Sequence, residues 1–106
     1  MISAVFFRQN GRPAGFRASG HSGYAEAGSD VVCAAVSAAV SLTECLLDDV
    51  LKAGAKVRVD AKNASVELRL PGSAANEQFE PALRALRLYL ESLQGEYPDH
   101  IVISEE

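Results

Sequence analysis

A cysteine and a histidine flank a glycine-rich segment. His21 lies in the sequence GHSGYAEAGS, residues 20–29, and Cys33 follows at the start of an apolar periodic stretch. If Asp30 is the N-cap of a helix, Cys33 lies in the first turn, where unpaired backbone N–H groups and the positive end of the helix dipole stabilise a thiolate. Thiols in such places have pKa values lowered to about 3.5–7.5. Cys33 is therefore a candidate nucleophile, and a fold-back of the segment would bring His21 within reach as its base.

The residues alone leave other interpretations open. His21 could be a surface histidine beside a buried Cys33 thiol. Asp30 could either cap the helix, which we favour, or orient His21 as the third group of a triad. The histidine and cysteine spacings match no known zinc pattern, so we expect no metal. The glycine-rich segment also lacks the GK[ST] ending of a phosphate-binding loop, and we expect no cofactor.

The second cysteine, Cys45, falls in the middle of the predicted helix, far from its N-terminus. Unpaired cysteines are usually small buried hydrophobic residues, so we predict a structural role for Cys45. A thiol redox sensor would require a disulfide between Cys33 and Cys45. On one intact helix these positions lie about 18 Å apart at about 1.5 Å per residue, whereas a disulfide needs Cα atoms within about 7 Å.

The composition is that of a single globular domain, residues 1–106, with 48% hydrophobic and 23% charged residues. A formal net charge of −4 disfavours broad binding to nucleic acid. The N-terminal segment lacks the basic residues and the cleavage site of a secretory signal. The longest weakly polar run, Val31–Leu42, is shorter than the ~20 residues that span a bilayer. We therefore expect a cytoplasmic protein that does not enter a membrane.

Hydrophobic periodicity predicts the element order ββαββαβ. The predicted strands cover residues 2–8, 15–19, 56–60, 65–70 and 101–104, and the predicted helices cover residues 31–53 and 79–95. These elements fit an α+β two-layer sandwich, in which both helices pack on one face of a five-stranded mixed sheet.

Each predicted helix has an apolar stripe at helical spacing. In the first helix the stripe is Val32, Val36, Ala39, Val40, Thr43, Leu46, Leu47 and Val50, and in the second it is Phe79, Leu83, Leu86, Leu90 and Leu93. Ser37, Val40 and Glu44 lie within about 40° of Cys33 at 100° per residue. We nevertheless assign Glu44 to a solvated helix face, together with the other acidic residues of the helices.

The residues that carry the candidate chemistry resemble a known signature. Gly20-His21, Gly28 and the sequence DVVCAAVS at residues 30–37 are similar to the motif of the ribosomal-processing cysteine protease (Prp) family. The resemblance extends over essentially the whole chain. It implies a homodimeric bacterial protease that removes the N-terminal extension of large-subunit ribosomal protein number twenty-seven, cutting after an aromatic pair and before a small residue.

The same resemblance implies roles for individual residues. The family's nucleophile matches Cys33 and its general base matches His21, while Asp30 and Ser37 match further signature positions. A substrate with two aromatic side chains needs an apolar groove, and we expect the glycine-rich segment to bind it through Gly20, Gly23, Tyr24 and Gly28. Backbone N–H groups at the start of the helix, including that of Cys33, are expected to stabilise the oxyanion. A non-catalytic ribosome-assembly or peptide-binding module with the same groove is the alternative.

Overall fold

The computed structural model describes residues 1–21, 30–72 and 74–106. The strands are β1 (Ile2–Gln9), β2 (Arg12–Ser19), β3 (Lys56–Asp60), β4 (Ser65–Arg69) and β5 (Ile101–Glu105). The α-helices are α1 (Val31–Glu44) and α2 (Glu80–Glu96). A π-helix, η2 (Cys45–Val50), continues α1, and a 3-10 helix, η3 (Ala74–Phe79), leads into α2.

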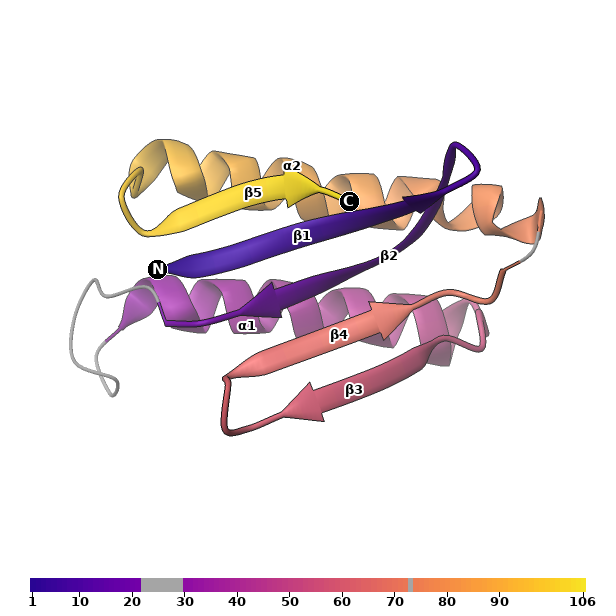
Figure 1. The fold of residues 1–106 in the computed structure, drawn as a ribbon, viewed down its shortest axis with the longest axis horizontal. Coiled ribbons are helices and arrows are strands. Elements are labelled where there is room, and N and C mark those ends of the chain that lie inside the picture. The colour runs from indigo at the N-terminus through magenta and orange to yellow at the C-terminus, as the bar shows by residue number, and fades with distance from the viewer. Residues whose placement is uncertain (22–29, 73) are drawn as a thin grey trace.

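The strands form one five-stranded sheet in the order β3-β4-β2-β1-β5. The β1–β5 pair is parallel and the other three pairs are antiparallel, so the sheet is mixed. Both α-helices cover the same face of the sheet (Figure 1). The predicted two-layer α+β sandwich and its element order are confirmed.

The first hairpin is set by local sequence. Gln9 pairs with Arg12, which leaves Asn10 and Gly11 as a two-residue loop with positive φ angles of 55° and 76°. Asn-Gly is the preferred sequence for such a loop, because both positions need left-handed backbone and the resulting twist matches that of the strands. The β1–β2 register that follows brings the end of β2 back beside the start of the chain.

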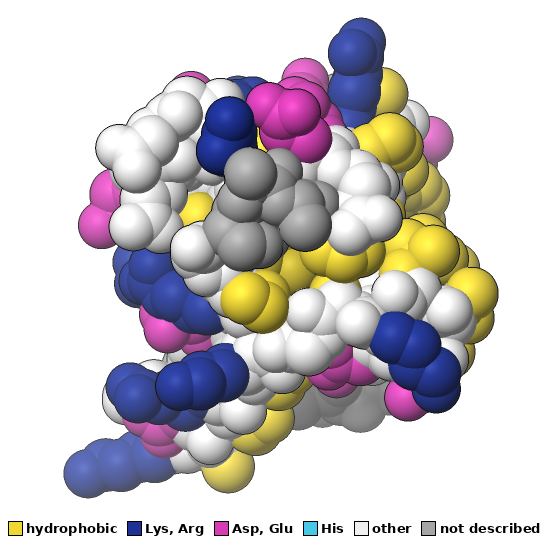
Figure 2. Space-filling view, turned by 90° about the vertical axis from the view of Figure 1, so that its right-hand side faces the viewer, with side chains coloured by type: hydrophobic (Ala, Val, Ile, Leu, Met, Phe, Trp, Pro, Cys, Tyr) yellow, Lys and Arg dark blue, Asp and Glu magenta, His cyan; other side chains and the backbone are white. Residues whose placement is uncertain are grey.

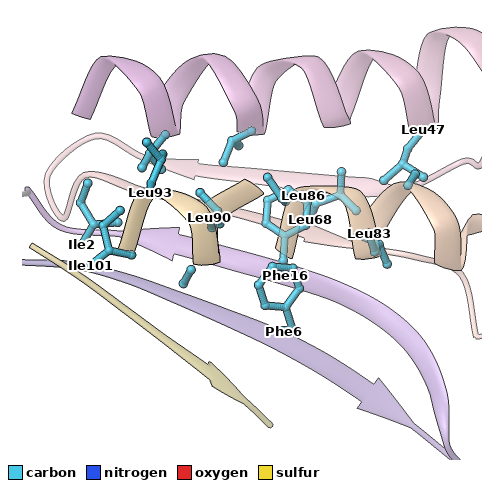
Figure 3. Close-up of a cluster of buried hydrophobic side chains, with 14 of the residues drawn as sticks. Ile2, Phe6, Phe16, Leu47, Leu68, Leu83, Leu86, Leu90, Leu93 and Ile101 are labelled. Carbon is cyan, nitrogen blue, oxygen red and sulfur yellow. The ribbon is translucent and has the colours of Figure 1, made fainter. Parts of the chain in front are cut away.

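The core lies between the sheet and the helices (Figure 3). The predicted inner stripe of α2 is buried in full. It packs against the inward residues of β1, β2 and β5, where Ile2, Phe16 and Ile101 are at most 3% exposed. Burying such side chains stabilises the fold by about 1.5–3 kcal/mol each.

The stripe of the first helix departs from prediction at its C-terminal end. Val32, Val36, Val40 and Leu47 are buried, but Leu46 and Val50 are exposed. The helix does not continue as an α-helix to residue 53, because residues 45–50 form the wider π-helix, in which the backbone N–H of Leu51 donates to the carbonyl of Leu46. The wider turn changes the angular position of the residues that follow, and Leu46 and Val50 face outward.

Helix α1 and η2 together, Val31–Val50, are long and apolar enough to cross a membrane by length and composition alone, with a mean hydropathy of 1.7. This segment is longer than the run expected from the sequence. A core helix also meets this criterion, and five residues of the segment's inner side are buried against the rest of the protein.

The sheet is wider than the helical layer that covers it. Val59 on β3 pairs with Val66, and Val57 pairs with the fully buried Leu68, so both β3 valines face the helix layer. They remain 40% (Val57) and 68% (Val59) exposed because β3 is an edge strand that lies beyond α1 (Figure 1). The uncovered strip between α1 and β3 is where the candidate site lies.

Candidate active site

The start of α1 is fixed by Asp30. Its Oδ1 atom accepts the backbone N–H groups of Val32 and Cys33, each at 3.0 Å. Asp30 has extended backbone, with φ −80° and ψ 97°, and is 6% exposed. It is therefore the N-cap, as the sequence pattern predicts, and Cys33 lies in the first turn, where the helix dipole favours an anion.

The Asp30 cap also alters one expectation. The N–H of Cys33, expected to stabilise an oxyanion, donates to Asp30 Oδ1 in this structure. A donor held in this way is not aimed at the position of a substrate oxyanion. In this arrangement the Cys33 N–H takes part in the hydrogen bond that caps the start of α1.

Gly20 positions His21 at the end of β2. Its φ is +90°, and a Cβ atom there would lie 2.4 Å from the carbonyl oxygen of Met1. Its N–H donates to the carbonyl of Ala64 at 3.1 Å. Only glycine fits this close approach, which places His21 between the start of β1 and the β3–β4 turn. His21 itself is exposed.

His21 and Cys33 line the same cavity, of about 470 Å³. Gly20 and Ser37 line it as well. The structure thus brings together four of the residues selected from the sequence, while Asp30 holds the adjacent helix start. Gly23, Tyr24 and Gly28 lie outside the described residues.

The cavity is a groove between α1 and the second hairpin. One wall is a single face of α1, formed by Cys33, Val36, Ser37, Val40, Ser41 and Glu44. The opposite wall comes from the end of β3, the following turn and the start of β4: Val59, Asp60, Ala61, Ala64, Ser65 and Val66. The groove exists because neither α1 nor α2 covers β3, so the side chain of Val59 is left to line an opening. A groove with apolar walls and a few polar groups is typical of a peptide-binding site.

Sequence reasoning missed Glu44 as part of this groove. Its position within about 40° of Cys33 on the helix was the available signal, but the general assignment of acidic residues to solvated faces obscured it. Glu44 is half-buried. Burial raises the pKa of its carboxyl above the ordinary value, and the neighbouring Asp48 carboxylate raises it further.

The described lining of the groove is acidic. It contains two carboxylates, Glu44 and Asp60, and no lysine or arginine. Asp60 holds the β3–β4 turn, because its side chain accepts the backbone N–H groups of Lys62 and Asn63 and the Asn63 side-chain amide. Among the described residues, no set of three or more His, Cys, Asp and Glu side chains could hold a metal ion.

Cys45 is not the buried structural residue that the sequence predicted. Its side chain is exposed. Cys45 begins the π-helix on the side of the helix away from the buried stripe, which here runs through Thr43 and Leu47. Both cysteines lie in the described part of the chain, and neither forms a disulfide.

The sequence of residues 1–102 matches the family described as cysteine protease Prp. The chain belongs to the cysteine protease Prp family. A comparison with curated proteins gives no significant match.

Solved structures share the Prp fold over the full chain. The essential ribosomal processing protease Prp from S. aureus, in complex with a covalently linked product peptide, matches with a TM-score of 0.87 and 19% identity, covering 100% of both chains. The same protease with a substrate peptide gives a TM-score of 0.84 at 19% identity, again over 100% of both chains. SMU.848 from Streptococcus mutans gives 0.81 at 23% identity, covering 99% of this chain and 93% of that one. At these identities the matches establish the fold.

As a member of the Prp family, this protein is a cysteine protease. The described groove contains a thiol and an imidazole, the pair that cysteine proteases use as nucleophile and base. The thiol lies where a helix N-terminus favours its anion, and the groove beside it has apolar walls that suit a peptide.

Proposed function

We propose that this protein is a cysteine endopeptidase that removes the N-terminal extension of bacterial large-subunit ribosomal protein number twenty-seven, a step needed for ribosome maturation. The observation that carries the proposal is that Cys33, in the first turn of α1, lines one groove with His21. The similarity in fold to a ribosomal processing protease with bound substrate and product peptides supports the choice of substrate.

In the proposed mechanism, Cys33 is the nucleophile and His21 the general base. The imidazole takes the thiol proton, and the Cys33 thiolate attacks the carbonyl carbon of the scissile bond. The imidazolium then donates its proton to the leaving amine, the C–N bond breaks, and a thioester remains on Cys33. His21 then deprotonates a water molecule, which attacks the thioester carbonyl. The C–S bond breaks, the imidazolium returns its proton to sulfur, and the released carboxylic acid loses its own proton to solvent.

The groove supplies contacts that fit a substrate with two aromatic side chains. Its apolar lining is made by Ala18, Val36, Val40, Val59 and Val66. We assign substrate binding to this lining together with Gly20 and the predicted contacts Gly23, Tyr24 and Gly28. Ser37 lines the groove next to Cys33 and is assigned a supporting role, and Asp30 maintains the helix start that holds Cys33.

In the deciding experiment, four purified proteins are each incubated with the extended ribosomal protein of the same organism, and the product masses are measured. We expect wild type and Cys45→Ala to release the N-terminal extension, and Cys33→Ala and His21→Ala to leave the substrate intact. Cys45→Ala is the matched control, because Cys45 is a thiol on the same helical segment that does not line the groove. Cleavage by Cys33→Ala would refute the mechanism.

The alternative is a peptide-binding or ribosome-assembly module that uses the same groove without cutting. The membership in a protease family counts against it. If wild type binds the extended ribosomal protein but leaves its mass unchanged, with Cys33 shown to be reduced, this alternative replaces the protease.

We further propose a homodimer that acts in the cytoplasm. A second, apolar hollow lies between α1 and α2 on the side away from the sheet, lined mainly by alanines and by Leu42, Leu46, Leu86 and Tyr89. Leu42 is 71% exposed. Hydrophobic side chains gather on the right of Figure 2, where the helical layer faces solvent. Such a patch is typical of a surface covered by a partner.

A further inference from the structure

The groove extends well beyond the candidate catalytic pair. Cys33, Ser37, Val40, Ser41 and Glu44 follow one face of α1 and all line it. At a rise of about 1.5 Å per residue, Glu44 lies about 16 Å along the helix from Cys33. The groove therefore has a catalytic end at Cys33 and a distal end at Glu44.

The distal end carries a carboxylate, that of Glu44, for which the described part of the chain provides no lysine or arginine partner. Among the described residues, no ion pair or side-chain hydrogen bond involves Glu44, whereas the other groove carboxylate, Asp60, is held by its own turn. Glu44 is half-buried, and the carboxylate of Asp48, four residues further along the chain, acts on it as a like charge. Burial and like charge both disfavour the carboxylate, so this arrangement costs stability in the isolated protein.

We propose that Glu44 is a specificity-determining residue that binds a lysine or arginine side chain of the substrate. The inference rests on the proposed protease function and adds a substrate preference to it. An arriving cation would supply the missing partner, with a charge-assisted hydrogen bond to the carboxylate. The aliphatic stem of the same side chain would lie along Val40 and the valines of the opposite wall.

The geometry also fixes where in the substrate the cation must be. An extended peptide advances about 3.3 Å per residue, so 16 Å corresponds to about five residues. A lysine or arginine side chain covers part of this distance itself. The preferred cation is therefore about three to five residues from the scissile bond, on the side of the peptide that runs along α1.

The test is a lysine scan of a cleavable peptide that contains the processing site of the ribosomal protein. A single lysine is placed in turn at each position two to seven residues from the scissile bond, on either side, with alanine at the others. We expect kcat/KM to rise about tenfold when the lysine stands three to five residues away on one side. The rise should disappear in Glu44→Gln and reverse in Glu44→Lys, which should instead prefer a glutamate at that position.

Asp49→Asn is the matched control, because Asp49 is an exposed acid close to Glu44 in the chain that does not line the groove. This variant should keep the wild-type preference. Thermal unfolding of each variant checks that it is folded. Cleavage of all peptides by wild type at equal rates would overturn the inference and leave the protease function standing, as would an unchanged preference in Glu44→Gln. Cleavage of none of them would refute both.

Discussion

Asp30 Oδ1 accepts the backbone N–H of Cys33 at 3.0 Å, so the cap of α1 also holds the backbone of the proposed nucleophile. The same oxygen accepts the N–H of Val32, which is completely buried. A single carboxylate oxygen thus couples the stability of the helix start to the position of the thiol.

The first prediction concerns this cap. Asp30→Ala leaves two N–H groups without their acceptor, and should lower the free energy of unfolding by about 1–2 kcal/mol. It should also reduce cleavage more than it reduces substrate binding, because the thiol loses its support. Asp30→Asn keeps an acceptor oxygen and should recover most of the stability in urea unfolding. An Asp30→Ala protein with wild-type kcat would show that the cap does not position Cys33.

The second prediction separates reactivity from exposure. Cys45 is exposed, whereas Cys33 is partly buried. If exposure alone controlled reaction, Cys45 would be alkylated first. Because Cys33 is the proposed nucleophile and lies in the first turn of α1, we expect iodoacetamide near pH 6 to modify it several-fold faster than Cys45. Peptide mass mapping over time measures both rates in one sample, and faster labelling of Cys45 would contradict the assignment of Cys33.

The third prediction concerns the glycine before His21. Gly20→Ala adds a Cβ that would lie 2.4 Å from the Met1 carbonyl oxygen in left-handed backbone. The start of β1 must therefore shift, and we expect a loss of about 2–4 kcal/mol in the free energy of unfolding. Gly54→Ala is the control, because Gly54 has φ +69° but no atom within 4 Å of the added Cβ. It should cost only about 1 kcal/mol. Equal losses would mean that the close approach to Met1 is unimportant.

The fourth prediction follows from the raised pKa of Glu44. Since burial and Asp48 raise the pKa of this carboxyl in the folded protein above its unfolded value, its ionised form opposes folding. This penalty is fully present above the folded pKa and is relieved as the pH falls through it toward about 4.5. Glu44→Gln should thus unfold at a higher temperature than wild type at pH 7, with the difference disappearing near pH 4. Comparing the two proteins at each pH removes the contributions of all ionisable groups that they share.

The fifth prediction tests the proposed dimer. Leu42→Glu places a charge on the apolar surface between the helices, and should convert the dimer to a monomer in sedimentation experiments at micromolar concentration. Leu88→Glu is the control, because Leu88 is an exposed leucine of α2 that does not line this hollow. Sedimentation of wild type as a monomer would refute the dimer.

Local patterns in the sequence predicted the elements well. The Asp30 cap and the leucine stripe of α2 each depend on interactions within a few residues, and both were found as expected. The end of α1 was not predictable in this way. A π-helix contains the same types of residue as an α-helix, so the sequence does not indicate where the helix widens. Only the structure shows that Leu46 and Val50 face outward.

The candidate site was predicted only in part, because local patterns identify some of its residues and the packing of distant elements determines the others. His21 and Cys33 could be selected because their types and the adjacent cap suggest chemistry. Glu44 and Val59 line the groove only because β3 extends beyond the helical layer, and that arrangement involves elements distant in sequence.

The parallel pairing of β1 with β5 has a consequence for how the protein is made. Residues 2–6 pair with residues 101–105, and Ile2 and Ile101 share the core. Contacts of such long sequence separation form late, because closing a long loop costs entropy before any contact is gained. Strand β1 therefore lacks one of its two neighbouring strands until residues 101–105 have left the ribosome. The start of β1, which supports Gly20 beside the groove, gains its second neighbouring strand only then, so the mature site should form only once β5 has paired.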